Sequence, residues 1–82
     1  MIKVYSANWC TGCKAIKKVL NSKGITFIEV DIDTLEGMKE AKELNIRAIP
    51  ITVVGNKQFV GSKPETIADI LEALDDQNNN SN

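Results

Sequence analysis

Apolar residues along the chain follow two different spacings, and these spacings predict the elements of secondary structure. Four segments are rich in β-branched and aromatic residues, as strands are, and they lie at residues 2–6, 25–30, 46–54 and 57–61. Three other segments repeat apolar residues three and four positions apart, as amphipathic helices do, and they lie at residues 11–23, 34–44 and 64–74. The predicted order is therefore β-α-β-α-β-β-α.

The second predicted helix has the clearest internal pattern. Thr34 begins the segment and is expected to be the N-cap of the helix, because a threonine hydroxyl can accept a hydrogen bond from a free backbone N–H of the first turn. Leu35, Met38, Ala41 and Leu44 then recur at helical spacing. We expect these four side chains to form the inner face of the helix.

The order of the elements predicts an α/β fold with one mixed sheet. The first two strands are joined through a helix and should be parallel, with a right-handed crossover. The last two strands are joined by Gly55 and Asn56, a hairpin signal, and should be antiparallel. A four-stranded sheet flanked by three helices accounts for residues 1–74 as one domain. Residues 75–82 are polar and are expected to be a frayed tail.

Composition narrows the classes of function. The chain has 82 residues, which is enough for one domain, and 43% of them are hydrophobic. Its net charge is −1 and no long basic run is present, so nucleic acid is a poor expectation for a partner. No apolar stretch approaches the roughly 20 residues of a membrane span, and the first residues lack the apolar stretch of a signal peptide. The expected location is therefore the reducing cytoplasm.

The only two cysteines, Cys10 and Cys13, lie where the first strand meets the first helix. A helix N-terminus carries unpaired N–H groups and a partial positive charge, both of which favour a thiolate. Lys14 adds a nearby positive charge that could tune the thiol pKa. We expect Cys10, nearer the helix end, to attack a target disulfide and Cys13 to resolve the mixed disulfide. The chain has no histidine, so no Cys–His nucleophile pair can form.

Two other uses of the cysteines stay open at this point. Both thiols could be small apolar fillers of the core. They could also bind a metal, but one Cys-x-x-Cys supplies two ligands where a closed zinc site needs four. Only a dimer or an external thiol could complete such a site, or an iron–sulfur cluster shared between chains. No resident metal or organic cofactor is expected.

Pro50 and Trp9 are the other candidates for the site. The Ile49–Pro50 bond could be cis, which would leave the backbone of Ile49 free to bind an extended partner. The residue pattern alone favours a trans proline that begins a strand. Trp9, immediately before Cys10, could be exposed for contact with partners or could pack into the core.

The combination of "WCTGC" after the first strand, "AIP" before the third and a glycine-containing turn before the last helix resembles the thioredoxin/glutaredoxin superfamily. The resemblance implies a thioredoxin-like fold, a cis Pro50 that faces the active site, Cys10 as nucleophile and Cys13 as resolving thiol. It also implies a substrate-binding surface, made of Trp9, Thr11, Gly12, Ile49, Pro50 and Gly61.

Two departures from the family patterns indicate which branch of the superfamily the chain resembles. Thioredoxins have a buried aspartate six residues before the nucleophile, where this chain has Val4. Glutaredoxins bind glutathione through a Gly-Gly-x-x-Asp pattern, where this chain has "VGSKPET" with Gly61 alone. That segment is similar to NrdH-type redoxins, although their usual Cys-Val-x-Cys centre differs from Thr11–Gly12.

The expected function is a monomeric dithiol–disulfide oxidoreductase that reduces protein disulfides. The NrdH resemblance implies ribonucleotide reductase as a partner and thioredoxin reductase as the electron source. A glutathione-dependent glutaredoxin is the enzymatic alternative. A module that binds or carries an iron–sulfur cluster is the alternative from another class.

Overall fold

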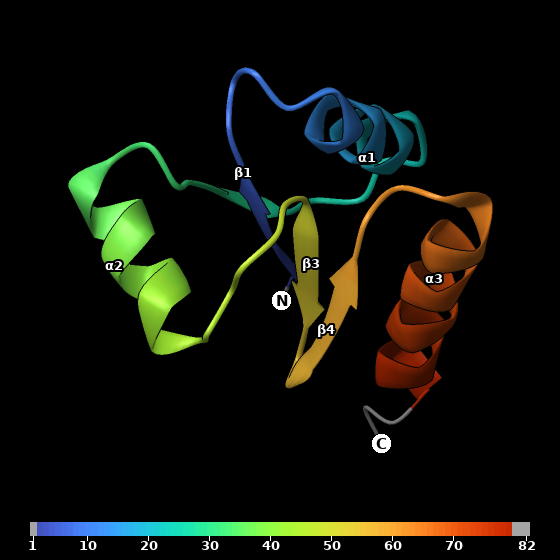
Figure 1. Ribbon diagram of the computed structural model, residues 1–82. Helices are drawn as coiled ribbons and strands as arrows, with labels where there is room; N and C mark the ends of the chain where they lie inside the picture. The colour runs from blue at the N-terminus through green and yellow to red at the C-terminus, as the bar shows by residue number, and fades with distance from the viewer. Residues whose placement is uncertain (1, 80–82) are drawn as a thin grey trace.

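The computed structural model describes the backbone of residues 2–79 and the side chains of residues 2–77 (Figure 1). The elements follow the predicted order, and their bounds are β1 Ile2–Ser6, α1 Thr11–Ser22, β2 Ile28–Asp31, α2 Leu35–Glu43, β3 Ile51–Val54, β4 Lys57–Val60 and α3 Pro64–Asn79. None of these helices is long and apolar enough to cross a membrane.

The four strands form one mixed sheet in the order β2-β1-β3-β4. β1 pairs with β2 in parallel, with Val4 opposite Glu29, and it pairs with β3 in antiparallel. β3 and β4 form the predicted hairpin, in which Gly55 takes a left-handed conformation with φ 63°. The topology expected for an α/β thioredoxin-like fold is therefore confirmed.

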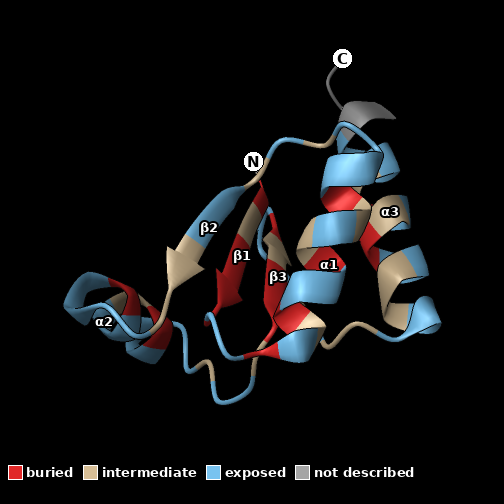
Figure 2. Ribbon diagram, turned by 90° about the horizontal axis from the view of Figure 1, so that it is seen from above, coloured by how far each residue is buried: buried red, intermediate tan, exposed pale blue. Residues whose placement is uncertain are grey.

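Helices cover both faces of the sheet, with α1 and α3 on one face and α2 on the other (Figures 1 and 2). The larger core lies under α1 and α3, and its buried residues are Ile2, Val4, Ile16, Leu20, Val54, Ile70 and Ala73. A smaller core under α2 contains Tyr5, Ala41 and Ile51. Side chains of β1 therefore pack alternately into the two cores, as expected for a strand covered on both sides.

The inner face expected for α2 is wrong at three of its four positions. Ala41 is buried, but Leu35 is 81% exposed, and Met38 and Leu44 are also exposed. Gly37 is buried beside Ala41 in the helix packing, and a Cβ atom at Gly37 would collide with the carbonyl group of Asp31. The close approach that Gly37 permits sets the rotation of α2 in which Leu35 and Met38 are exposed.

The same face of the sheet carries a partly buried polar contact. The hydroxyl of Tyr5 donates to Glu40 Oε2 at 2.6 Å, and Lys3 Nζ donates to the same oxygen at 3.2 Å. Burial raises the pKa of Tyr5 far above its ordinary value, and the hydrogen bond to Glu40 and the charge of Glu40 add to the effect. The two hydrogen bonds from Tyr5 and Lys3 lower the pKa of Glu40.

Three element bounds differ from the sequence prediction by more than one residue. β3 begins at Ile51 rather than residue 46, because its pairing with β1 starts with Ile51 opposite Tyr5. β2 begins at Ile28 rather than residue 25, because pairing with β1 starts with Lys3 opposite Ile28. Helix α3 continues to Asn79, past the domain end expected at residue 74. No glycine or proline follows Leu74 to stop the helix, and polar side chains do not by themselves end one. The remaining part of the expected tail, residues 80–82, lies outside the described residues.

Candidate active site

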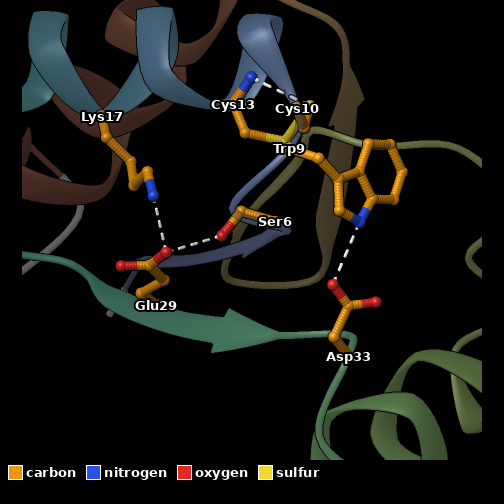
Figure 3. Close-up of a disulfide and its surroundings, with 7 residues drawn as sticks. All are labelled: Ser6, Trp9, Cys10, Cys13, Lys17, Glu29 and Asp33. Atoms are coloured by element: carbon orange, nitrogen blue, oxygen red, sulfur yellow. Dashed lines mark hydrogen bonds and ion pairs between the residues drawn. A yellow bond between two sulfur atoms is a disulfide. The ribbon is translucent and has the colours of Figure 1, made fainter.

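Cys10 and Cys13 form a disulfide at the N-terminus of α1 (Figure 3). Cys10 is the N-cap residue with φ −94° and ψ 110°, and the Cα atoms of the two cysteines are 5.2 Å apart. The backbone N–H of Cys13 donates to Cys10 Sγ, with 3.1 Å between nitrogen and sulfur. The sulfur of Cys10 therefore occupies the position of an N-cap acceptor, where the first turn of the helix favours negative charge.

The two sulfurs differ in how far solvent reaches their residues. Cys10 is 8% exposed, whereas Cys13 is fully buried. Both pack with Ala7, and Ile32 and Ile49 cover this cluster. A partner can therefore approach Cys10 more readily than Cys13.

Pro50 lies against the start of α1, and the Ile49–Pro50 bond is cis. A Cβ atom on Gly12 would lie 3.2 Å from Pro50 Cδ and 3.2 Å from Ser62 Oγ, so Gly12 allows the close approach of these segments. The backbone N–H of Gly61 donates to the carbonyl of Pro50 at 2.9 Å. The structure thus brings together Gly12, Pro50 and Gly61 from three distant parts of the sequence.

Trp9 lies on the surface beside the disulfide. Its side chain is among the exposed large hydrophobic groups, with 68% of the residue accessible, and its Nε1 donates to Asp33 Oδ2 at 3.0 Å. Figure 3 shows the indole extending from the cysteines toward Asp33. Of the two alternatives for Trp9, the exposed position is the one that the structure has.

Two of the remaining predicted site residues closely follow Cys10 in the chain, and the third, Ile49, is distant in sequence but lies beside the redox pair in space. Thr11 and Lys14 are both exposed on the first turns of α1. The backbone N–H of Lys14 donates to the carbonyl of Cys10 at 3.2 Å, as the helix requires. Ile49 is half-buried and packs against the cysteine cluster.

Sequence reasoning missed a polar cluster beneath the disulfide, shown in Figure 3. Glu29 Oε2 accepts hydrogen bonds from Lys17 Nζ at 2.6 Å and from Ser6 Oγ at 2.8 Å. The bond from Lys17 and then that from Ser6 lower the pKa of Glu29, while partial burial opposes them. Lys17 lies on α1, and its side chain is 20% exposed. The available signal was its position four residues after Cys13, which places it one turn further along α1.

Within the described residues, no group of three or more cysteine, aspartate or glutamate side chains could hold a metal ion. The two sulfurs are bonded to each other rather than directed at a shared ligand position.

Comparison with known proteins agrees with the resemblance found in the sequence. A family model described as Glutaredoxin matches residues 2–60. The glutaredoxin-like protein NrdH of Lactococcus lactis subsp. cremoris (strain MG1363) is 36% identical over 69 residues, which cover 83% of this chain and 96% of that protein. The solved structure of the NrdH-redoxin from Escherichia coli is 26% identical with a TM-score of 0.69, covering 84% of this chain and 92% of that one. A glutaredoxin structure from Archaeoglobus fulgidus, 23% identical with a TM-score of 0.72, covers 85% and 84% of the two chains and shares the fold.

These likenesses, together with the disulfide at the start of α1, define a thiol–disulfide oxidoreductase of the thioredoxin fold. Within that class the chain belongs to the glutaredoxin family, and Cys10–Cys13 is its redox pair. Its relatives include NrdH-type redoxins, as the sequence resemblance implied.

Proposed function

We propose that the protein reduces disulfides in partner proteins, with Cys10 as the attacking thiol and Cys13 as the resolving thiol. The observation that carries this assignment is the difference in burial, because Cys10 keeps 8% of its surface exposed and Cys13 keeps none. The N–H of Cys13, 3.1 Å from Cys10 Sγ, would stabilise a Cys10 thiolate once the disulfide is reduced.

The reaction proceeds through two successive thiol–disulfide exchanges. The Cys10 thiolate attacks one sulfur of the partner disulfide, forms a mixed disulfide and releases the other partner sulfur as a thiolate, which takes a proton from water. The Cys13 thiolate then attacks Cys10 Sγ and releases the second partner sulfur. The partner gains two electrons, and the protein is left with the Cys10–Cys13 disulfide.

The surface around Cys10 supplies the contacts for the partner. Trp9, Thr11, Gly12, Ile49, Pro50 and Gly61 are the residues proposed to form it. The exposure of Trp9 supports this role, as does the hydrogen bond that links Gly61 to Pro50. Lys14 is proposed to favour the Cys10 thiolate by its charge, an effect limited by its exposure to solvent.

We further propose that thioredoxin reductase recharges the protein and that ribonucleotide reductase is a partner. The support is the similarity to NrdH proteins and the segment "VGSKPET", which lacks the glutathione-binding pattern. The Escherichia coli NrdH-redoxin structure is described as a basis for a thioredoxin-like activity profile. On this proposal the protein acts as a monomer in the cytoplasm and needs no cofactor besides its redox-active disulfide.

The first experiment reduces the oxidised protein with two systems in parallel, both driven by NADPH. One contains thioredoxin reductase, and the other contains glutathione and glutathione reductase. Fast NADPH consumption with thioredoxin reductase alone is the expected result. Turnover with glutathione alone would identify a glutathione-dependent glutaredoxin and refute the proposed electron source.

Variants of the two cysteines test the assignment of roles. Cys10→Ser is expected to abolish reduction of a disulfide substrate, because no accessible thiolate remains. Cys13→Ser is expected to accumulate a mixed disulfide between Cys10 and the substrate, visible by mass spectrometry under non-reducing conditions. Equal residual activity in the two variants would contradict the roles given to them.

A further inference from the structure

A cavity of about 320 Å³ opens beside the disulfide, between α2 and the segment that leads into β3. Its apolar wall includes Trp9, Ile32, Met38 and Ile49. Ile32 and Ile49 also pack against Cys10 and Cys13. The cavity and the redox pair therefore share a wall, and a molecule held in the cavity would lie next to the reacting sulfurs.

Two cations complete the lining of this cavity, Lys42 from the last turn of α2 and Arg47 from the loop that follows. Both are exposed. The ion pairs within the described residues join Lys3 to Glu40 and Lys17 to Glu29, so neither Lys42 nor Arg47 has a carboxylate partner there. Asp33 accepts a hydrogen bond from Trp9 but does not itself line the cavity. The cavity thus combines an apolar wall with two positive charges that are free to bind an acid.

We propose that this cavity selects partner segments which carry a large apolar side chain and a carboxylate next to their disulfide. The inference rests on the proposed function and names the class of substrate for the same site. The volume is near the lower end of the roughly 300–1,000 Å³ found for small-molecule sites, which suits a side chain of a bound segment. The apolar group would contact Trp9 and Met38. The carboxylate would pair with Arg47, whose planar guanidinium binds carboxylates through two parallel hydrogen bonds, and with Lys42.

The test measures single-turnover rates of the fully reduced protein with synthetic peptides under anaerobic conditions. Each peptide contains one intramolecular disulfide, and the peptides differ only in two residues beside it: Leu and Asp, Leu and Lys, or Ser and Asp. The reaction is quenched with acid, and the reduced peptide is quantified by chromatography. Oxidised glutathione, an acidic disulfide without the apolar group, is a fourth substrate, and uncharged hydroxyethyl disulfide is a fifth.

The protein variants are Arg47→Glu, the double variant Lys42→Glu with Arg47→Glu, and Lys39→Glu. Lys39 is exposed on the same helix and does not line the cavity. Its replacement changes the net charge as much as Arg47→Glu does, so it controls for long-range attraction between the whole protein and an acidic peptide. Circular dichroism of each variant confirms that it is folded.

The Leu–Asp peptide is expected to react about three- to ten-fold faster than the Leu–Lys peptide, the range that one or two exposed ion pairs can supply. It should also react faster than the Ser–Asp peptide and oxidised glutathione. Arg47→Glu should remove the preference for Asp over Lys and the double variant should reverse it, while Lys39→Glu should keep it.

The proposal would be overturned if the double variant kept the preference for Asp over Lys. It would also be overturned if Lys39→Glu lost this preference as fully as Arg47→Glu does. Equal rates for the Leu–Asp peptide and oxidised glutathione would also overturn it, because the apolar wall would then contribute nothing. Hydroxyethyl disulfide separates this failure from that of the proposed function. If the proposed function holds, the parent protein and all variants reduce this small disulfide at similar rates. A parent protein that fails to reduce any of these substrates would refute the proposed function itself.

Discussion

At the scale of single residues, the site combines positions that the sequence could indicate with others that it could not. Cys10 and Cys13 were predictable, because only two cysteines are present and both lie where the first strand meets the first helix. Glu29 was not, because its contact with Lys17 depends on the register that sets Val4 of β1 opposite Glu29 of β2. That register cannot be derived from local residue types.

The ion pair of Glu29 and Lys17 predicts a dependence of stability on pH. The pKa of Glu29 is below its ordinary value, about 4.3, because Lys17 and Ser6 donate to its charged form. The stabilisation is therefore complete above the unfolded-state pKa and is lost as the pH falls through the lower folded-state pKa. Because the Glu29 side chain is 41% exposed, we expect Glu29→Gln to cost only about 0.5–1 kcal/mol at neutral pH.

Urea unfolding of the parent and Glu29→Gln proteins, at neutral pH and below the folded-state pKa, measures this difference. Glu36→Gln, at an exposed position on α2, is the matched control and should stay within about 0.5 kcal/mol of the parent. Glu40 titrates in both proteins, so its effect cancels from the comparison. A cost that is the same at both pH values would contradict the assignment to the ionised form of Glu29.

At the scale of elements, the hydrophobic pattern predicted that a helix forms between β2 and β3 but gave the wrong rotation. The pattern considers only apolar side chains. It does not take into account a glycine, whose lack of a side chain lets the helix approach a neighbouring segment of backbone. Gly37 has that role beside Asp31, and it also donates its backbone N–H to the N-cap hydroxyl of Thr34 at 2.9 Å. The position of the cavity beside α2 follows from this rotation, so it could not be predicted either.

Two substitutions in α2 distinguish the observed rotation from the expected one. Gly37→Ala should lower the free energy of unfolding by about 1–3 kcal/mol, because the new Cβ collides with Asp31 and crowds Thr34 Oγ1. Leu35→Ala should change it by less than about 0.5 kcal/mol, because Leu35 is exposed. Both are measured by urea unfolding. A large loss for Leu35→Ala with little effect of Gly37→Ala would restore the inner face predicted from the sequence.

At the scale of the whole molecule, general rules predicted the parallel pairing of β1 with β2, the β3–β4 hairpin and the helices that flank one sheet. The strand order, in which β1 pairs with β3, came from the structure. A parallel β-α-β unit and a hairpin joined through β1 leave few ways to build one sheet. The meeting of Gly12, Pro50 and Gly61 was different, because it joins three segments that are far apart in sequence. Only the resemblance to a known superfamily indicated it, since no local pattern reports a contact between distant loops.

The domain boundary at residue 74 remains a prediction, and a shortened chain tests it. We propose that a protein ending at Leu74 folds with a stability within about 1 kcal/mol of the parent, because Asp75, Asp76 and Gln77 are exposed and add little burial. Urea unfolding gives the stability, and circular dichroism should show a smaller helical signal from the loss of the last turns of α3. A chain that fails to fold would place the end of the domain beyond Leu74.

Trp9 gives the molecule an optical reporter of its own chemistry. It is the only tryptophan in the chain, it directly precedes Cys10, and its ring is open to solvent. A neighbouring disulfide quenches indole fluorescence by accepting an electron from the excited ring, and a pair of thiols quenches it less. Emission from the unlabelled protein should therefore rise on reduction and fall on oxidation. Each turnover, and the arrival of a partner over the indole, can then be followed in real time without a dye.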